Sequence, residues 1–86
     1  DLDTNTLVSI SNLASLHIEM GNPRLALPLM EECLRGRRQT MGEEHDVTLK
    51  AMGLLSRVHS DMGNYDEALP LARRVLEARR RTLGRT

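Results

Sequence analysis

The chain has 86 residues, a formal net charge of zero and one aromatic side chain, Tyr65. A chain of this length forms one small domain that buries only about 60% of its unfolded surface, so we expect marginal stability. Zero net charge and the shortage of aromatic rings argue against nucleic-acid binding, and the apolar runs are too short for a signal peptide or a membrane span.

The first predicted helix is amphipathic. Residues at three- and four-residue spacing form its apolar stripe: Leu7, Ile10, Leu13, Ala14 and His17. Gly21 is placed to end this helix in the left-handed conformation. Asn22 is a favourable N-cap for the next helix, and Pro23 suits its first position.

The second predicted helix extends to Gly42. Its stripe consists of Ala26, Leu27, Met30, Cys33 and Leu34. Pro28 falls in the second turn and removes one helical hydrogen bond. Because the apolar stripe continues past this proline, we expect a slight kink or an irregular first turn there, and no helix break.

The second half of the chain repeats the first at an offset of 42 residues, seen between Gly21 and Gly63. Met-Gly-Asn at residues 20–22 recurs at 62–64, and Ala-Leu-Pro-Leu at 26–29 recurs at 68–71. The register predicts a third helix with the stripe Leu49, Met52, Leu55, Ser56 and His59, and a fourth with Ala68, Leu69, Ala72, Val75 and Leu76.

The predicted fold is all-α, because no strand-like alternation occurs. Two helix-turn-helix repeats, or four antiparallel helices, would form a short right-handed α-solenoid. We expect one repeat domain over residues 1–86, with repeat 1 at 1–42 and repeat 2 at 43–86. About three repeats are normally needed for a stable array, so we expect the chain to be an excerpt of a longer one.

Residues 62–69, Met-Gly-Asn-Tyr-Asp-Glu-Ala-Leu, resemble the central turn of a tetratricopeptide repeat. The 42-residue period, longer than the common length of about 34, resembles the kinesin light chain-type subclass, as does Gly-Glu-Glu-His at 42–45. The resemblance implies close helix contacts at four small residues: Ala14, Ser56, Ala26 and Ala68. The family's groove asparagine falls on Asn12, whereas the matching position in repeat 2 is Leu54. The family's proline and aspartate after the histidine are replaced by Asp46 and Val47.

The resemblance also implies a function, a protein–protein interaction scaffold that binds a peptide or partner protein through the concave face of the first and third helices. The residues expected to line that groove are Val8, Ser11, Asn12, Ser15, Glu19, Lys50, Gly53, Leu54, Arg57 and Asp61. Lys50 and Arg57 lie two helical turns apart on one face, which favours an acidic partner.

An alternative is a purely structural, self-assembling solenoid segment with no ligand of its own. The fourth helix would expose Leu69, Ala72 and Leu76, an apolar patch that soluble monomers usually bury. As an isolated fragment the chain is therefore expected to form a homo-oligomer. End-to-end stacking, two-fold pairing and exchange of hairpins are all open, and closed assemblies are favoured because they are commoner.

No catalytic constellation is recognised, so we expect no enzyme, no cofactor and no metal site. We expect His17 and His59 to be structural, hydrogen-bonded residues, and His45 to be a helix cap. Cys33 cannot form an internal disulfide; a small buried thiol and a reducing, cytoplasmic setting are the simplest interpretation.

Arginines gather in the C-terminal halves of the second and fourth helices: Arg35, Arg37, Arg38, Arg73, Arg74, Arg79, Arg80 and Arg81. We expect a solvated face that complements the helix dipoles, with an acidic or nucleic-acid partner as the alternatives. Glu31, Glu32, Glu43 and Glu44 are close enough in sequence to neutralise part of this charge.

Overall fold

The protein is described by a computed structural model that covers residues 3–83. Four helices follow one another, α1 at Thr4–Glu19, α2 at Pro23–Met41, α3 at Asp46–Asp61 and α4 at Tyr65–Leu83. Within the described range the remaining residues form turns and short connections, with no strand. The predicted all-α class and the four helices are confirmed.

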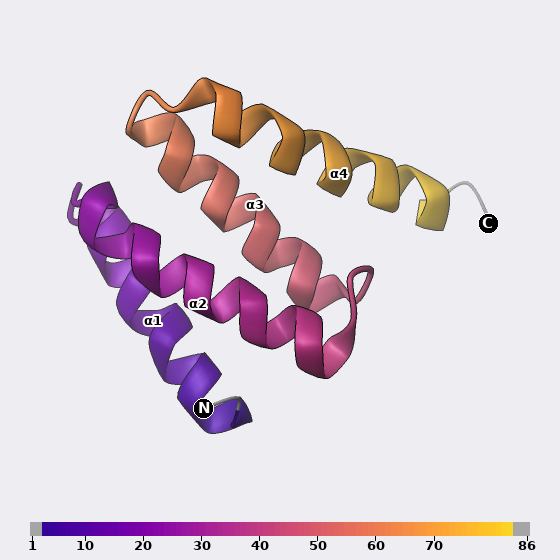
Figure 1. The fold of residues 1–86 in the computed structure, drawn as a ribbon, viewed down its shortest axis with the longest axis horizontal. Helices are drawn as coiled ribbons and strands as arrows, with labels where there is room; N and C mark the ends of the chain where they lie inside the picture. Colours follow the sequence, from indigo (N-terminus) through magenta and orange to yellow (C-terminus); the bar gives the residue numbers. More distant parts are fainter. Residues whose placement is uncertain (1–2, 84–86) are drawn as a thin grey trace.

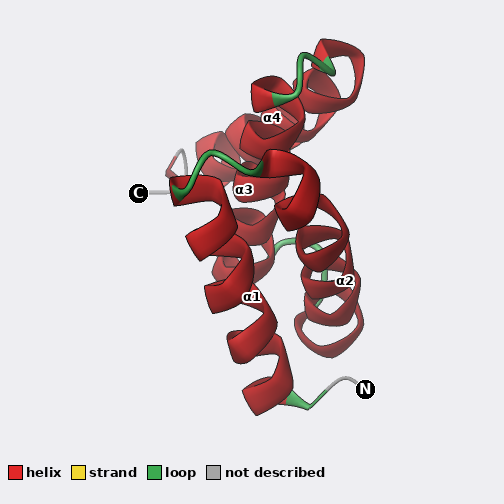
Figure 2. Ribbon diagram, turned by 90° about the vertical axis from the view of Figure 1, so that its left-hand side faces the viewer, coloured by secondary structure: helices red, strands yellow, loops and turns green. Residues whose placement is uncertain are grey.

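The helices pack in chain order, each against the next (Figure 1). Contacts between α2 and α3 join the two hairpins, so α2 and α3 each have helices on two sides. The molecule measures 38 × 31 × 17 Å. Figure 2 shows that the short loops lie at the ends of the helices and that α1 forms one outer edge.

Each hairpin turn depends on a glycine with positive φ. Gly21 has φ of 79° and Gly63 has φ of 80°, a conformation that costs glycine little. The chain then returns so that the Asn22 N–H donates to the His17 carbonyl at 2.8 Å, and Asn64 to His59 at 2.7 Å. The predicted helix stops are confirmed.

The N-caps are only partly as predicted. The His45 Nδ1 accepts a hydrogen bond from the Val47 N–H at 3.1 Å, so the predicted histidine cap of α3 is confirmed. Asn22 occupies the N-cap position of α2, but its side chain makes no capping bond. The Leu25 N–H, which an N-cap side chain can engage, donates to the Asn22 carbonyl instead, at 3.1 Å.

Pro28 and Pro70 lie inside continuous helices, α2 and α4, as predicted. Neither proline breaks its helix, because each stands in the second turn and removes one backbone bond while the packing of later turns persists. A sequence rule that ends a helix at proline would have divided both elements wrongly.

The core lies between the helices and is aliphatic. Its largest fully buried side chains include Leu7, Met30, Met52 and Val58. The close contacts predicted at small residues are present: Ala14 and Ala26 are completely buried, and the Ser56 Oγ donates to the Ala68 carbonyl at 3.0 Å. Small side chains at these positions let neighbouring backbones approach, which fixes how α1, α2 and α3 stand around the candidate site.

Candidate functional site

A cavity of about 200 Å³ lies where α1 and α3 flank α2. Five of the ten predicted groove residues line it: Val8, Ser11, Asn12, Lys50 and Leu54. They come from the first half of α1 and the first three turns of α3. The structure therefore brings together half of the predicted set in one hollow, with two polar groups on α1 opposite a lysine and a leucine on α3.

The other predicted groove residues do not line this cavity: Ser15, Glu19, Gly53, Arg57 and Asp61. Most of them lie farther along the same helices, toward the hairpin turns. The Arg57 Nε is 3.9 Å from the Asp61 carboxylate, one helical turn away, so these two opposite charges offset each other locally.

Four further residues complete the lining: Cys33, Arg37, Val47 and Ala51. The first two belong to α2 and form the floor between the flanking helices. Arg37 was expected on a solvated face, and that expectation is wrong, because only 6% of this residue is exposed. A signal was present in the sequence: Arg37 follows Met30 by seven residues and Cys33 by four, on the apolar stripe of its helix.

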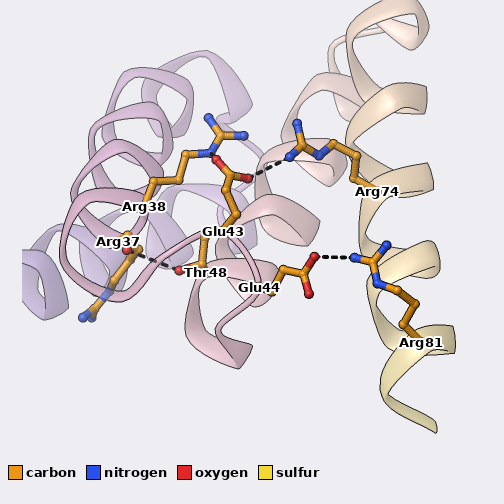
Figure 3. Close-up of polar contacts among 7 residues, drawn as sticks. All are labelled: Arg37, Arg38, Glu43, Glu44, Thr48, Arg74 and Arg81. Atoms are coloured by element: carbon orange, nitrogen blue, oxygen red, sulfur yellow. Dashed lines mark hydrogen bonds and ion pairs between the residues drawn. The ribbon is translucent and has the colours of Figure 1, made fainter. Parts of the chain in front are cut away.

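The polar environment of Arg37 is incomplete. Its carbonyl accepts a hydrogen bond from the Thr48 Oγ1 at 3.3 Å, which joins α2 to the start of α3. Its side-chain Nε is buried and has no hydrogen-bond partner among the described residues. Figure 3 shows the guanidinium pointing away from Glu43 and Glu44, the acidic residues of the connecting loop.

Those two glutamates pair with other arginines. Glu43 lies 2.8 Å from the Arg38 Nε and 2.9 Å from an Arg74 nitrogen, and Glu44 pairs with Arg81. The loop acids thus connect the end of α2 with α4 across the repeat boundary (Figure 3). Part of the arginine charge is neutralised there, as predicted from the sequence.

The candidate catalytic and metal-binding side chains do not assemble into a site. Cys33 is a buried free thiol whose Sγ is 4.0 Å from the Leu7 carbonyl. Within residues 3–83 no three His, Cys, Asp or Glu side chains are grouped as metal ligands. His59 is buried and His17 partly so, but the predicted hydrogen bond is not found at Nδ1 of either ring.

An apolar surface is exposed on each outer helix. On α4 it consists of Leu69, Ala72 and Leu76, the residues predicted for self-association. At α1 it consists of Leu13 and Leu16 on the helix and Met20 at its C-cap, although Leu13 was expected in the buried stripe. Within residues 3–83 α1 packs closely against α2, whereas α3 packs between α2 and α4, so Leu13 is solvent-exposed while its repeat equivalent Leu55 is buried.

None of the described helices is both long and apolar enough to cross a membrane. No curated protein sequence matches the chain. The family model described as "Tetratricopeptide repeat" matches residues 5–81, a range that contains nearly all of the four helices, both glycine turns and every lining residue of the cavity. The repeat, the two helical hairpins and this match lead to one conclusion: the chain belongs to the tetratricopeptide repeat family.

Proposed function

We propose that this chain is a protein-interaction module that holds a segment of a partner protein between α1 and α3. Tetratricopeptide repeats generally mediate protein–protein interaction, and the family is a non-enzymatic scaffold. The observation that carries the proposal for this chain is the cavity of about 200 Å³ at the junction of the two repeats. A concave junction of this kind suits an extended or helical peptide.

The lining favours a polypeptide ligand with an acidic side chain. Ser11 and Asn12 offer hydrogen-bonding groups for a peptide backbone, and Val8 and Leu54 offer apolar contact. The charged residues of the lining are Arg37 and Lys50, both cationic. A partner segment that combines an apolar residue with a neighbouring carboxylate would match this arrangement.

A peptide-array screen with the 86-residue chain, followed by fluorescence anisotropy on the best peptide, tests the proposal. We expect Asn12→Ala and Leu54→Glu to weaken binding about tenfold or more. Arg57→Glu should weaken it less, because Arg57 lies outside the cavity and pairs with Asp61. The matched control is Asn5→Ala, an exposed asparagine on α1 outside the lining.

Circular dichroism must show unchanged helicity for each variant. Peptides that bind all variants equally well would contradict the proposed face, and loss of helicity in Asn12→Ala would assign that residue a structural role. If no peptide binds the wild-type chain, the interaction function itself is contradicted for this fragment.

We propose a second function, self-stacking, on an independent observation. Leu16 on α1 is 57% exposed, but its repeat equivalent Val58 is fully buried; Leu76 on α4 is 49% exposed, but its equivalent Leu34 is 3% exposed. Val58 and Leu34 belong to the one core that includes the interface between α2 and α3. The exposed faces of α1 and α4 therefore carry residues equivalent to residues of the core around the contact between α3 and α2. The α4 face of one copy could pack against the α1 face of another in the same way.

Head-to-tail stacking of copies is favoured over a two-fold pairing of α4 faces, because the outer faces of α1 and α4 are equivalent to the two sides of the contact between α3 and α2. Head-to-tail contact is heterologous and extends until it is capped. In a longer array neighbouring repeats would cover the same faces, and in the isolated chain a second copy would cover them.

Sedimentation equilibrium of two variants separates these assemblies. Leu76→Glu and Leu16→Glu should each be monomeric alone, because each lacks one side of the contact. Mixed together, they should form a dimer that cannot extend, since each supplies the intact face that the other lacks. Self-association of Leu16→Glu alone would favour α4–α4 pairing, and a wild-type chain that is monomeric at high concentration would contradict self-stacking.

A further inference from the structure

A segment of two arginines followed by a threonine lies near the end of the second helix of each repeat. Residues 37–40 are Arg-Arg-Gln-Thr, and residues 79–82, at the 42-residue offset, are Arg-Arg-Arg-Thr. Both threonines are exposed, and each comes one residue before the described end of its helix, Met41 of α2 and Leu83 of α4. The two segments are almost alike in sequence, so a difference between them has to come from packing.

The arginines of the segment in repeat 1 are held by the protein itself. Arg37 is 6% exposed, and its carbonyl accepts a hydrogen bond from the Thr48 Oγ1 at 3.3 Å. The Arg38 Nε lies 2.8 Å from the Glu43 carboxylate. Another protein that binds both guanidinium groups before Thr40 would have to disrupt the junction between α2 and α3.

The equivalent arginines of repeat 2 are open to solvent. Arg79 and Arg80 are exposed, and neither has an ion pair within residues 3–83. Their neighbour Arg81 pairs with Glu44 of the connecting loop (Figure 3). The two guanidinium groups that stand three and two residues before Thr82 are therefore available to the carboxylates of another protein.

The Thr82 hydroxyl is accessible in the same segment. Its Oγ1 donates to the Ala78 carbonyl at 3.1 Å within α4, a local bond of small net value that water can replace. Thr82 also lines a cavity of about 240 Å³ together with Arg79 and Asp46, which leaves space beside the side chain for an added group. Because helix ends open at low free energy, only the last described turn of α4 has to unwind for the segment to become extended.

We propose that Thr82 is a phosphorylation site for a basophilic protein kinase, meaning a kinase whose substrate groove presents acidic residues to arginines that precede the acceptor hydroxyl. Kinases select substrates partly by such charge patterns. Guanidinium–carboxylate pairs give this selection both strength and geometry. The proposal goes beyond the proposed function, because it requires neither a peptide in the groove nor a stack of copies.

The reaction needs only the co-substrate that the kinase brings, ATP with Mg²⁺. The Thr82 Oγ1 attacks the γ-phosphorus, and the bond from that phosphorus to the β,γ-bridging oxygen breaks. ADP leaves with the electron pair of that bond, and the hydroxyl proton passes to the aspartate base of the kinase. The product is a phosphothreonine with about −1.5 to −2 charges at pH 7.

The two repeats distinguish this proposal from a simpler role of the arginines. If the arginines only complement the negative ends of the helix dipoles, a kinase should treat the two segments alike. If exposed and unpaired arginines are required, Thr82 should be modified and Thr40 should be protected. Thr40 is therefore a control within the same molecule.

The experiment incubates the 86-residue chain with Mg-ATP and a basophilic kinase, the catalytic subunit of cAMP-dependent protein kinase. Fragment mass spectrometry locates the phosphate and gives the initial rate at each threonine. We expect the rate at Thr82 to be at least about tenfold higher than at Thr40, the ratio that one charge-assisted hydrogen bond provides. Peptides of residues 34–41 and 76–83 serve as unfolded references, and we expect them to react at similar rates.

Three variants test the arginines. Arg79→Gln and Arg80→Gln should each lower the rate at Thr82 about tenfold or more, because each removes one guanidinium. Both positions are exposed, so we expect these variants to fold. The matched control is Arg73→Gln, at another exposed arginine of α4 that has no ion pair within residues 3–83. It lies outside the segment and should leave the rate unchanged.

Several results would overturn the proposal. Equal rates at Thr40 and Thr82 in the folded chain would show that packing does not select the site. A folded chain that stays unmodified while the peptide of residues 76–83 reacts would show that the end of α4 does not open for a kinase. Unchanged rates at Thr82 in both Arg79→Gln and Arg80→Gln would show that the arginines are not the recognised groups.

Discussion

The second helices of the two repeats, α2 and α4, share an Ala-Leu-Pro-Leu segment and a pair of arginines at equivalent positions, but they are buried to very different extents. Leu34 on α2 is 3% exposed, whereas the equivalent Leu76 on α4 is 49% exposed. The difference follows from position, because within residues 3–83 α2 packs closely against both α1 and α3, while the close packing of α4 is with α3. Identical residues thus become core or surface according to their place in the stack.

The same comparison applies to function. Arg37 lines a cavity that α1 and α3 flank, and the equivalent Arg79 lies on the surface. The candidate site is therefore a property of the junction between repeats, and a single hairpin does not contain it. Each further repeat added after α4 would create another such junction, with its own choice of residues at the positions of Ser11, Asn12 and Lys50.

The largest predicted difference between the repeats is in Leu→Ala variants. Leu34→Ala should cost about 2–5 kcal/mol, because it opens a cavity in the core. Leu76→Ala should stay within about 0.5 kcal/mol in dilute solution, where α4 has no partner. Urea unfolding followed by circular dichroism measures both. Equal losses would mean that α4 is covered in solution, as self-stacking would produce at higher concentration.

The fold could be predicted because its signals are local and occur twice. The 42-residue offset, the turns at Gly21 and Gly63 and the apolar stripes each specify one hairpin. Five of the nine residues that line the cavity were among those expected from helix faces together with the family resemblance, and their role in binding stays a prediction. The kinesin light chain-type subclass and the right-handed turn of the solenoid stay predictions from that resemblance.

The features that could not be predicted from the sequence depend on packing between helices. Arg37 was assigned to the surface from its charge and from its place in an arginine run, although its spacing from Met30 puts it on the buried stripe. The exposure of Leu13 depends on the place of α1 in the stack, where α1 packs closely against α2 and does not lie between two helices as α3 does within the described residues, and no local pattern contains that information. Asn22 takes the predicted N-cap position, but its side chain makes no capping bond, and the Leu25 N–H donates to the Asn22 backbone carbonyl instead.

An alanine pair on α4 tests the close contact within repeat 2. Ala68 is buried where α3 and α4 touch, and Ala72, one turn later, is exposed. Ala68→Leu should cost about 1–3 kcal/mol through overpacking, and Ala72→Leu should change stability by less than about 0.5 kcal/mol. Thermal unfolding gives both values. Similar midpoints for the two variants would contradict the assigned approach of the helices at Ala68.

The glycine turns are where the two repeats should not differ. Gly21 and Gly63 have nearly the same positive φ, and no atom lies within 4 Å of a Cβ added at either residue. Backbone strain alone should therefore set the cost, at about 2 kcal/mol for Gly63→Val and about 1 kcal/mol for Gly63→Asn, which tolerates positive φ better. Gly21→Val and Gly21→Asn should repeat that order in the same denaturation assay. A reversed order at either turn would show that something other than φ limits the residue.

The smallest predicted effect concerns the ionic link between the repeats. Glu43 lies between Arg38 of repeat 1 and Arg74 of repeat 2, and its side chain is 46% exposed. Pairs this exposed contribute about 0.2–1 kcal/mol, so Glu43→Gln should lower the melting temperature only slightly. Because exposed charges are screened within about 3 Å at about 1 M salt, that loss should disappear when the melt is repeated in concentrated sodium chloride. The control is Glu31→Gln, at an exposed glutamate of α2 with no ion pair within the described residues, which should have no effect at either salt concentration. A decrease in melting temperature for Glu43→Gln that persists in high salt would mean that Glu43 supports the conformation of the connecting loop. The contact of α2 with α3 would then hold the two hairpins together without help from these charges.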